Sequence, residues 1–218
     1  MEDYPSNIAR ALQNGEIDLG LVPVAIIPSL KEYHIISDYC ISCDGEVASV
    51  GLYAEKPVEE ITEVLLDYQS RTSVQLAQIL LREYWKVSPR IIPAHTDFRT
   101  CIKGNTAGVV IGDRALEQRK TSAFVYDLGT AWKQFTGLPF VFAAWISNKE
   151  LPADFIQEFN EANAIGLNAL PEVLKDLNND LIDLEEYYSK NIEYNFTENK
   201  RLALDLFLKS IKGNNGQV

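Results

Sequence analysis

LLDYQSRTSVQLAQILL, residues 65–81, decides the fold class, because it joins the end of a strand to a helix through a polar turn. The run Ile61–Leu66 is apolar except at Thr62 and Glu63, which predicts a buried strand. The residues that follow the turn give a broad apolar helical face, made by Val74, Leu76, Ala77, Ile79, Leu80 and Leu81. We expect that helix to continue to about Lys86.

The turn itself carries three hydroxyls and a guanidinium. Ser70, Thr72 and Ser73 lie where the helix begins, so one of them can cap it. A helix N-terminus carries partial positive charge and binds carboxylates or phosphates, and Arg71 adds a fixed charge. The spacing alone leaves two alternatives open, a well-capped helix with an exposed Arg71 and an anion-binding site.

The composition is that of an ordinary globular protein, with 218 residues, 46% of them apolar and 23% charged. A net charge of −11 argues against broad binding to nucleic acid or to an anionic membrane surface. No apolar run approaches the ~20 residues of a membrane helix. The first residues lack the basic and apolar regions of a signal peptide, so we expect a cytoplasmic protein.

Cysteine and histidine give little support to metal or redox chemistry. Cys40 and Cys43 have C-x-x-C spacing, but their neighbours are strand-like, and a zinc site would also need Cys101 and a histidine from elsewhere. His34 is expected to be structural, whereas His95 follows a strand and is left open between a cleft position and a structural one. No metal or other cofactor is predicted.

Along the chain, strand patterns alternate with helical patterns, which predicts an α/β fold. Strands are expected at 17–24, 33–40, 46–54, 61–66, 90–93, 107–113, 124–128 and 138–146. Helices are expected at 5–14, 114–120, 130–136, 155–170, 174–188 and 197–211, with fraying from Gly213 to Val218. The last three helices form a helical C-terminal tail.

The same pattern predicts two lobes, with residues 1–55 and 140–218 in lobe 1 and residues 56–139 in lobe 2. Three turns follow strands, at Pro23, at Ser70–Ser73 and at Gly112–Asp113. Ligands of open α/β sheets bind beyond the carboxyl ends of strands, so these turns are expected to line one cleft. Asp113 is also the expected cap of the helix that follows it.

Several stretches together are similar to the chorismate dehydratase family of the futalosine route to menaquinone. They cover most of residues 5–150 and read NGEIDLGLVP (14–23), GEVASV (45–50), SRTSV (70–74), IGDRAL (111–116) and DLGTAW…TGLPFVFA (127–143). The resemblance implies a two-lobed fold of the periplasmic-binding-protein type (type II). It also implies removal of water from chorismate, giving 3-[(1-carboxyvinyl)oxy]benzoate, without a metal or organic cofactor.

The resemblance further assigns roles to residues of this chain. Ser70, Thr72 and Ser73 would hold a carboxylate of chorismate, and Ser49 and the Gly112–Asp113 turn would line the same cleft. Arg71 would either face this small-molecule substrate or form a structural pair. No nucleic acid or membrane partner is implied, and a homodimer is left open, because the sequence does not reveal the oligomeric state.

The sequence departs from the family at its N-terminus. Family members begin with a strand and a Ser-Tyr-x-Asn-Thr type loop whose Asn takes part in catalysis, and this sequence starts after that loop. We therefore expect the first lobe, as given, to be incomplete and to lack part of its catalytic site. The alternatives are a 1,4-dihydroxy-6-naphthoate synthase-like enzyme of the same pathway, disfavoured by SRTS, and a non-catalytic small-anion binding protein.

Overall fold

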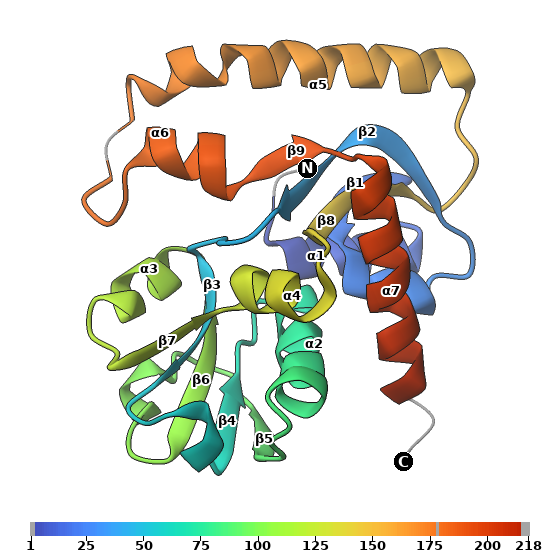
Figure 1. Cartoon of the computed structure of the whole chain (residues 1–218). Coiled ribbons are helices and arrows are strands. Elements are labelled where there is room, and N and C mark those ends of the chain that lie inside the picture. Colours follow the sequence, from blue (N-terminus) through green and yellow to red (C-terminus); the bar gives the residue numbers. More distant parts are fainter. Residues whose placement is uncertain (1–2, 178, 215–218) are drawn as a thin grey trace.

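The computed structural model describes residues 3–177 and 179–214, and within them the chain builds two β-sheets (Figure 1). The first sheet has the order β1-β8-β2-β9 and consists of β1 (Leu19–Pro23), β2 (His34–Cys43), β8 (Phe140–Ser147) and β9 (Glu193–Asn195). The second has the order β5-β4-β6-β3-β7 and consists of β3 (Val50–Ala54), β4 (Glu63–Leu66), β5 (Arg90–Pro93), β6 (Thr106–Ile111) and β7 (Phe124–Asp127).

Helices connect and cover these sheets. They are α1 (Pro5–Asn14), α2 (Thr72–Ile79), α3 (Asp113–Arg119), α4 (Leu128–Thr136), α5 (Ala153–Leu174), α6 (Leu184–Glu186) and α7 (Glu198–Asn214). One π-helical turn, Leu80–Tyr84, prolongs α2, and another, Tyr187–Asn191, prolongs α6. Short 3-10 turns lie at Val24–Ser29, Val58–Glu60 and Arg99–Cys101. The predicted α/β alternation is confirmed.

In the second sheet, β4 lies parallel to both β5 and β6, and α2 follows β4 as the opening stretch predicts. The strand predicted from residue 46 begins only at Val50, because the backbone makes a turn at Ala48, whose φ is 62°. β3 pairs with β6 and β7. The crossing into the second sheet therefore comes before the predicted boundary at 55/56, and the exact lobe limits stay a prediction.

The helix predicted for residues 174–188 is wrong in most of its length. α5 continues through Pro171 to Leu174, and helix resumes only at Leu184. In between, the Asn179 side chain accepts from the Leu181 N–H, and the Asp183 carboxylate caps α6 by accepting from the Glu186 N–H. These side chains stabilise turns in competition with helix.

The structure tests one further prediction only in part and another not at all. The predicted fraying concerns Gly213–Val218, of which residues 215–218 lie outside the described residues; α7 extends to Asn214. The prediction that the first lobe is incomplete is not tested by the structure and stays a prediction.

β9, which forms the end of the first sheet, has no counterpart among the predicted strands.

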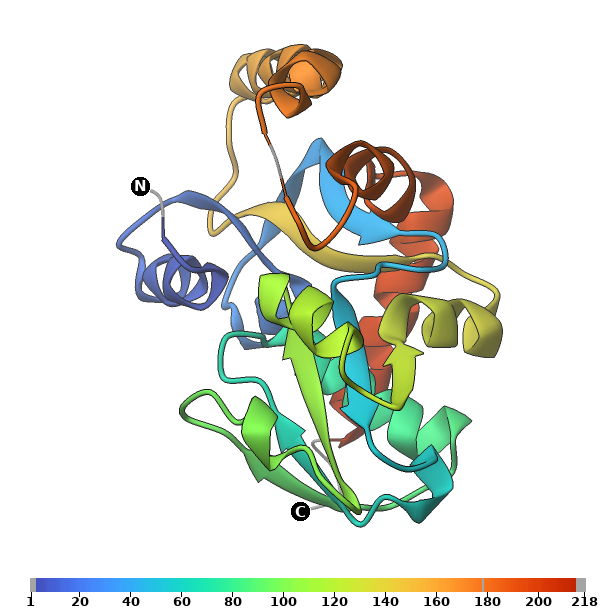
Figure 2. The ribbon, with the colours of Figure 1, turned by 90° about the vertical axis from the view of Figure 1, so that its left-hand side faces the viewer.

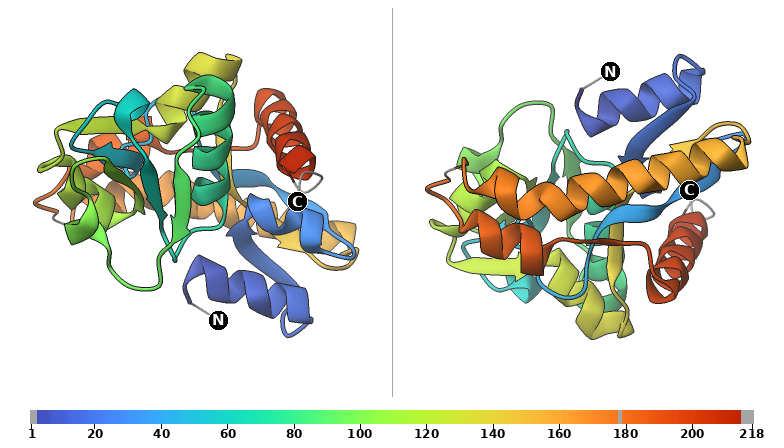
Figure 3. Two further views of the ribbon diagram at one scale, coloured as in Figure 1. Left: turned by 90° about the horizontal axis from the view of Figure 1, so that it is seen from below. Right: turned by 90° about the horizontal axis from the view of Figure 1, so that it is seen from above.

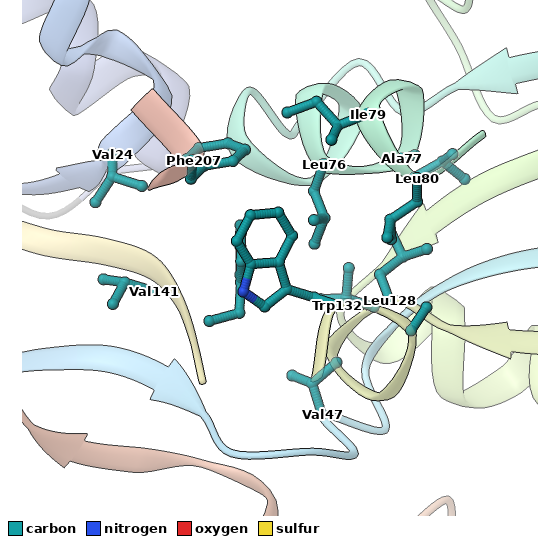
Figure 4. Close-up of a cluster of buried hydrophobic side chains, with 14 of the residues drawn as sticks. Val24, Val47, Leu76, Ala77, Ile79, Leu80, Leu128, Trp132, Val141 and Phe207 are labelled. Atoms are coloured by element: carbon teal, nitrogen blue, oxygen red, sulfur yellow. The ribbon is translucent and has the colours of Figure 1, made fainter. Parts of the chain in front are cut away.

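A large apolar core joins the two sheets, and Trp132 of α4 lies at its centre (Figure 4). Its indole is fully buried and donates to the Pro139 carbonyl at 3.0 Å. Leu76 of α2 approaches the indole from one side, and Phe207 of α7 meets it edge to face with 6.2 Å between centroids. The two lobes are therefore packed together rather than linked by the chain alone.

Two helices lie at the outside. α5 crosses the top of the molecule in Figure 1 and faces the viewer in the right panel of Figure 3, which is seen from above. The Ser37 hydroxyl of β2 donates to the Asn160 side chain of α5 at 2.8 Å. α1 lies at one side of the first sheet beside β1 (Figure 2). None of the helices in the described ranges is both long and apolar enough to cross a membrane. The cytoplasmic location stays a prediction.

Candidate functional site

A cavity of about 350 Å³ lies between the two sheets. This volume is within the ~300–1,000 Å³ of small-molecule sites. Its polar lining comes from Ser49, Gln69, Ser70, Thr72, Ser73 and Tyr187, and its apolar lining includes Pro5, Pro23, Ile41, Val47, Val50, Ile111, Phe142, Ala143 and Ile192. Gly112 completes the wall. The three predicted turns thus meet at one cavity.

The SRTS turn combines the two alternatives that its spacing leaves open. Arg71 holds the N-cap position of α2, and the Ser70 hydroxyl accepts from the Ser73 N–H of the first turn at 3.1 Å. The Ser73 side chain is buried against the cavity, and its hydroxyl has no protein partner within the described part of the chain. The N-terminal end of α2 therefore presents hydroxyl donors, together with the positive end of the helix dipole, to the cavity.

Thr72 has a different role from its two serine neighbours. Its hydroxyl donates to the Phe142 carbonyl of β8 at 3.0 Å and accepts from the Ala25 N–H at 3.3 Å. Both partners belong to the part of the chain around the first sheet, whereas Thr72 begins a helix of the second lobe. The Thr72 hydroxyl thus joins the lobes, and its only proton is committed to that bond.

Arg71, Asp113 and His95 are exposed and do not line the cavity. The expectation that Asp113 caps α3 is wrong, because Gly112 holds the N-cap position and no side chain caps this helix. Gly112 has φ 66° and ψ −150°, a conformation that favours glycine, and its N–H donates to the Ser49 carbonyl at 2.8 Å. Asp113 is left in the first turn, where its charge favours the helix dipole.

A buried ion pair beneath the SRTS turn was not predicted from the sequence. Arg114 donates through Nη2 to both oxygens of Asp67, at 2.9 and 2.8 Å, and to the Gln69 side chain at 2.8 Å. Asp67 also accepts from the N–H groups of Gln69 and Ile111. This pair fixes the turn that carries Ser70. A charged residue inside the 65–81 stretch, directly after an apolar strand, was the signal that could have found it.

Asp127 connects the Asp127–Gly129 motif to the Gly45–Ser49 motif by hydrogen bonds. Its carboxylate accepts from the N–H groups of Val47, Ala48 and Thr130, at 3.1, 2.8 and 2.9 Å. Burial raises the pKa of Asp127, although the three backbone hydrogen bonds oppose that shift. Asp127 therefore fixes the turn that places Ser49 in the cavity wall.

Gly129 lies beside Asp127, where the chain passes close to the Gly45–Ser49 turn. A Cβ atom there would come within 2.4 Å of the Gly45 carbonyl and 2.6 Å of the Cys43 sulfur. Since neither of these groups can move far in a packed crossing, only glycine fits. The Gly45–Ser49 and Asp127–Gly129 motifs are thus two halves of one junction between the lobes.

Tyr187 is a cavity residue that the sequence reasoning missed. It comes from the C-terminal tail, at the start of the π-helical turn after α6, and its hydroxyl lies 2.7 Å from the Ser49 hydroxyl. Burial raises the pKa of Tyr187, so its phenol is protonated at neutral pH. No sequence signal marks it, because Tyr188 beside it has the same chemistry and does not line the cavity.

None of the thiols and histidines lines this cavity. Cys40 and Cys43 are buried in β2, where burial raises the pKa of both thiols, and Cys101 is exposed in a 3-10 turn. His34 pairs with Glu32 on the surface at 2.8 Å. Within the described ranges, no group of three or more His, Cys, Asp or Glu side chains could hold a metal ion.

Comparison with known proteins adds relatives along nearly the whole chain. The chain is 29% identical to a chorismate dehydratase of Thermus thermophilus, over 95% of this chain and 84% of that protein. It is 26% identical to a chorismate dehydratase of Campylobacter jejuni, over 97% of this chain and 82% of that protein.

Solved structures agree on the fold. Protein AF1704 of Archaeoglobus fulgidus superposes with a TM-score of 0.66 at 14% identity, covering 98% of this chain and 85% of that one. The periplasmic aliphatic sulphonate binding protein SsuA of Escherichia coli superposes with a TM-score of 0.60 at 16% identity, covering 99% and 76%. The predicted fold of the periplasmic-binding-protein type is thereby confirmed.

A family model described as menaquinone biosynthesis matches residues 1–212, which include every element that lines the cavity. The chain therefore belongs to the menaquinone biosynthesis family.

Proposed function

We propose that this protein is a chorismate dehydratase, a hydro-lyase of the futalosine route to menaquinone that converts chorismate to 3-[(1-carboxyvinyl)oxy]benzoate. The observation that carries the proposal is that the SRTS and Gly45–Ser49 motifs line one cavity between the lobes, while Asp127 holds the Gly45–Ser49 turn in place. The two relatives named chorismate dehydratase support it over nearly the full chain.

The cavity suits a small carboxylated ring. Its walls are mostly apolar, and its polar groups are neutral hydroxyls, the Gln69 amide and the N-terminal end of α2. Neutral donors and a helix N-terminus stabilise a carboxylate. We assign the contacts with a substrate carboxylate to Ser70, Ser73 and Ser49, and we give Thr72 a role in holding α2 against the first lobe instead.

The chemistry requires only a limited contribution from the protein. Loss of a ring proton leaves an electron pair that forms a ring double bond, and the ring hydroxyl departs with a proton as water. The product ring is aromatic, so the driving force lies in the substrate. Apolar walls such as Phe142 and Ile192 would orient the ring and exclude bulk water.

The test measures chorismate binding by calorimetry and product formation by absorbance and mass spectrometry. We expect chorismate to bind and the double variant Ser70→Ala/Ser73→Ala to bind at least about tenfold more weakly, because it loses donors to a charged group. Ser88→Ala, which removes an exposed hydroxyl of the same lobe, is the matched control and should bind normally.

Two results would contradict the proposal. If the wild-type protein neither binds nor converts chorismate, the assignment fails. If chorismate binds but is converted neither by this chain nor by a form extended with the N-terminal strand and loop of the family, the protein is a small-anion binding protein instead. Formation of 1,4-dihydroxy-6-naphthoate by the protein, without turnover of chorismate, would favour the 1,4-dihydroxy-6-naphthoate synthase alternative.

A further inference from the structure

The C-terminal tail contributes a segment that reaches from the first lobe to the second, and we call residues 180–192 the strap. It contains α6 and the π-helical turn and leads into β9 of the first sheet (Figure 1). At one end, the Asp180 carbonyl accepts from Lys120 of the second lobe at 3.1 Å. At the other end, Asn191 donates to the Glu46 carbonyl at 3.0 Å. The strap therefore contacts the second lobe at one end and the turn between the two sheets at the other.

The strap is loosely packed against the second lobe. Between it and α3 lies a separate cavity of about 370 Å³, lined on one side by Leu116, Arg119 and Lys120 and on the other by Leu181, Ile182 and Glu186. At the other end of the strap, Ile192 belongs to the apolar core and Tyr187 packs against it. Over the cavity, a few polar contacts hold the strap, so its local stability is expected to be low there.

Tyr187 is the strap residue that enters the candidate site. Its side chain is half-buried, lines the cavity between the lobes and meets the Ser49 hydroxyl at 2.7 Å. Within the described part of the chain, neither hydroxyl has another side-chain or backbone partner at its oxygen. The two groups therefore form an isolated pair at the edge of the cavity.

The chemistry of the pair sets the direction of its hydrogen bond. A phenol is a stronger acid than an aliphatic alcohol, so Tyr187 is the donor and Ser49 the acceptor. The pair has two protons, and this bond uses the phenol's. The Ser49 proton remains for another acceptor, and accepting a bond from Tyr187 makes Ser49 a better donor, since linked hydrogen bonds polarise one another.

We propose that Tyr187 is a positioning residue of the candidate site, which holds the Ser49 hydroxyl so that its proton points to a carboxylate of the substrate. This inference rests on the proposed function. It assigns a substrate-directed role to the tail, through a segment that joins both lobes.

A double-mutant cycle on chorismate binding tests it, with Tyr187→Phe, Ser49→Ala and their combination. Tyr187→Phe keeps the ring and removes one neutral hydrogen bond, so it should raise the Kd about three- to tenfold. In the Ser49→Ala background the same change should alter the Kd less than about twofold, because Tyr187 then has nothing to position. Tyr188→Phe, the neighbouring ring outside the cavity, should leave the Kd unchanged.

The outcomes separate the two proposals. If Tyr187→Phe weakens binding equally in both backgrounds, Tyr187 does not act through Ser49 and the inference is overturned. It is also overturned if Tyr187→Phe leaves the wild-type Kd unchanged, or if Tyr188→Phe weakens binding as much. Failure of the wild-type protein to bind chorismate at all overturns the proposed function, and this inference with it.

Discussion

Asp127→Ala should destabilise the protein strongly, although the residue lies outside the apolar core. The carboxylate is the acceptor for three backbone N–H groups, those of Val47, Ala48 and Thr130, and only 8% of its side chain is exposed. Removing it leaves three donors without an acceptor. At about 1–1.5 kcal/mol for each donor, near the lower end because some water can enter, the free energy of unfolding should fall by about 3–4 kcal/mol.

Asp127→Asn gives a finer test of the same reasoning. The amide keeps one oxygen, which can still accept from Val47 and Thr130, but its NH₂ group would face the Ala48 N–H. The lost bond and the donor–donor contact are partly offset by removal of a buried charge, whose burial raises the pKa of Asp127. We expect a loss of about 1–2 kcal/mol, between wild type and Asp127→Ala.

Urea unfolding, followed by far-UV circular dichroism and by tryptophan fluorescence, measures these differences. Asp44→Ala is the matched control, because Asp44 lies in the same crossing but pairs with Lys133 at the surface, 42% exposed. Such a pair contributes about 1 kcal/mol or less. The reasoning is refuted if Asp127→Ala costs no more than Asp44→Ala, or if the Asn variant is the less stable of the two Asp127 variants.

Three further results are expected. Arg114→Met should lower the free energy of unfolding by about 3–5 kcal/mol in urea titrations, because it leaves Asp67 buried without its partner; a loss below 1 kcal/mol would contradict this. Gly129→Ala should yield little folded protein on purification, since its Cβ would lie 2.4 Å from the Gly45 carbonyl, whereas Gly166→Ala, which meets nothing within 4 Å, should fold normally. A thiol reagent at pH 8 should label Cys101 alone in the native protein and all three cysteines in urea; rapid native labelling of Cys40 or Cys43 would argue against their burial.

Local patterns in the sequence determine the elements and their order. The apolar run before residue 67 and the helical face after residue 73 are sufficient to predict β4 and α2, because their periodicities differ. The hydrogen bond from the first turn of α2 to a hydroxyl of SRTS is equally local, since the Ser70 oxygen reaches an N–H only three residues away. The strand-to-helix turn at Gly112 is also predicted, although Asp113 is not its cap.

Only the tertiary structure decides which of these turn residues form the site. Ser70, Thr72 and Ser73 look alike in the sequence, yet Thr72 is committed to Phe142 of the other lobe, 70 residues away. Ser49 owes its position to Asp127, and its hydroxyl meets Tyr187 across 138 residues of sequence. Hydrogen bonds of this kind depend on how two lobes pack, and no local periodicity records them.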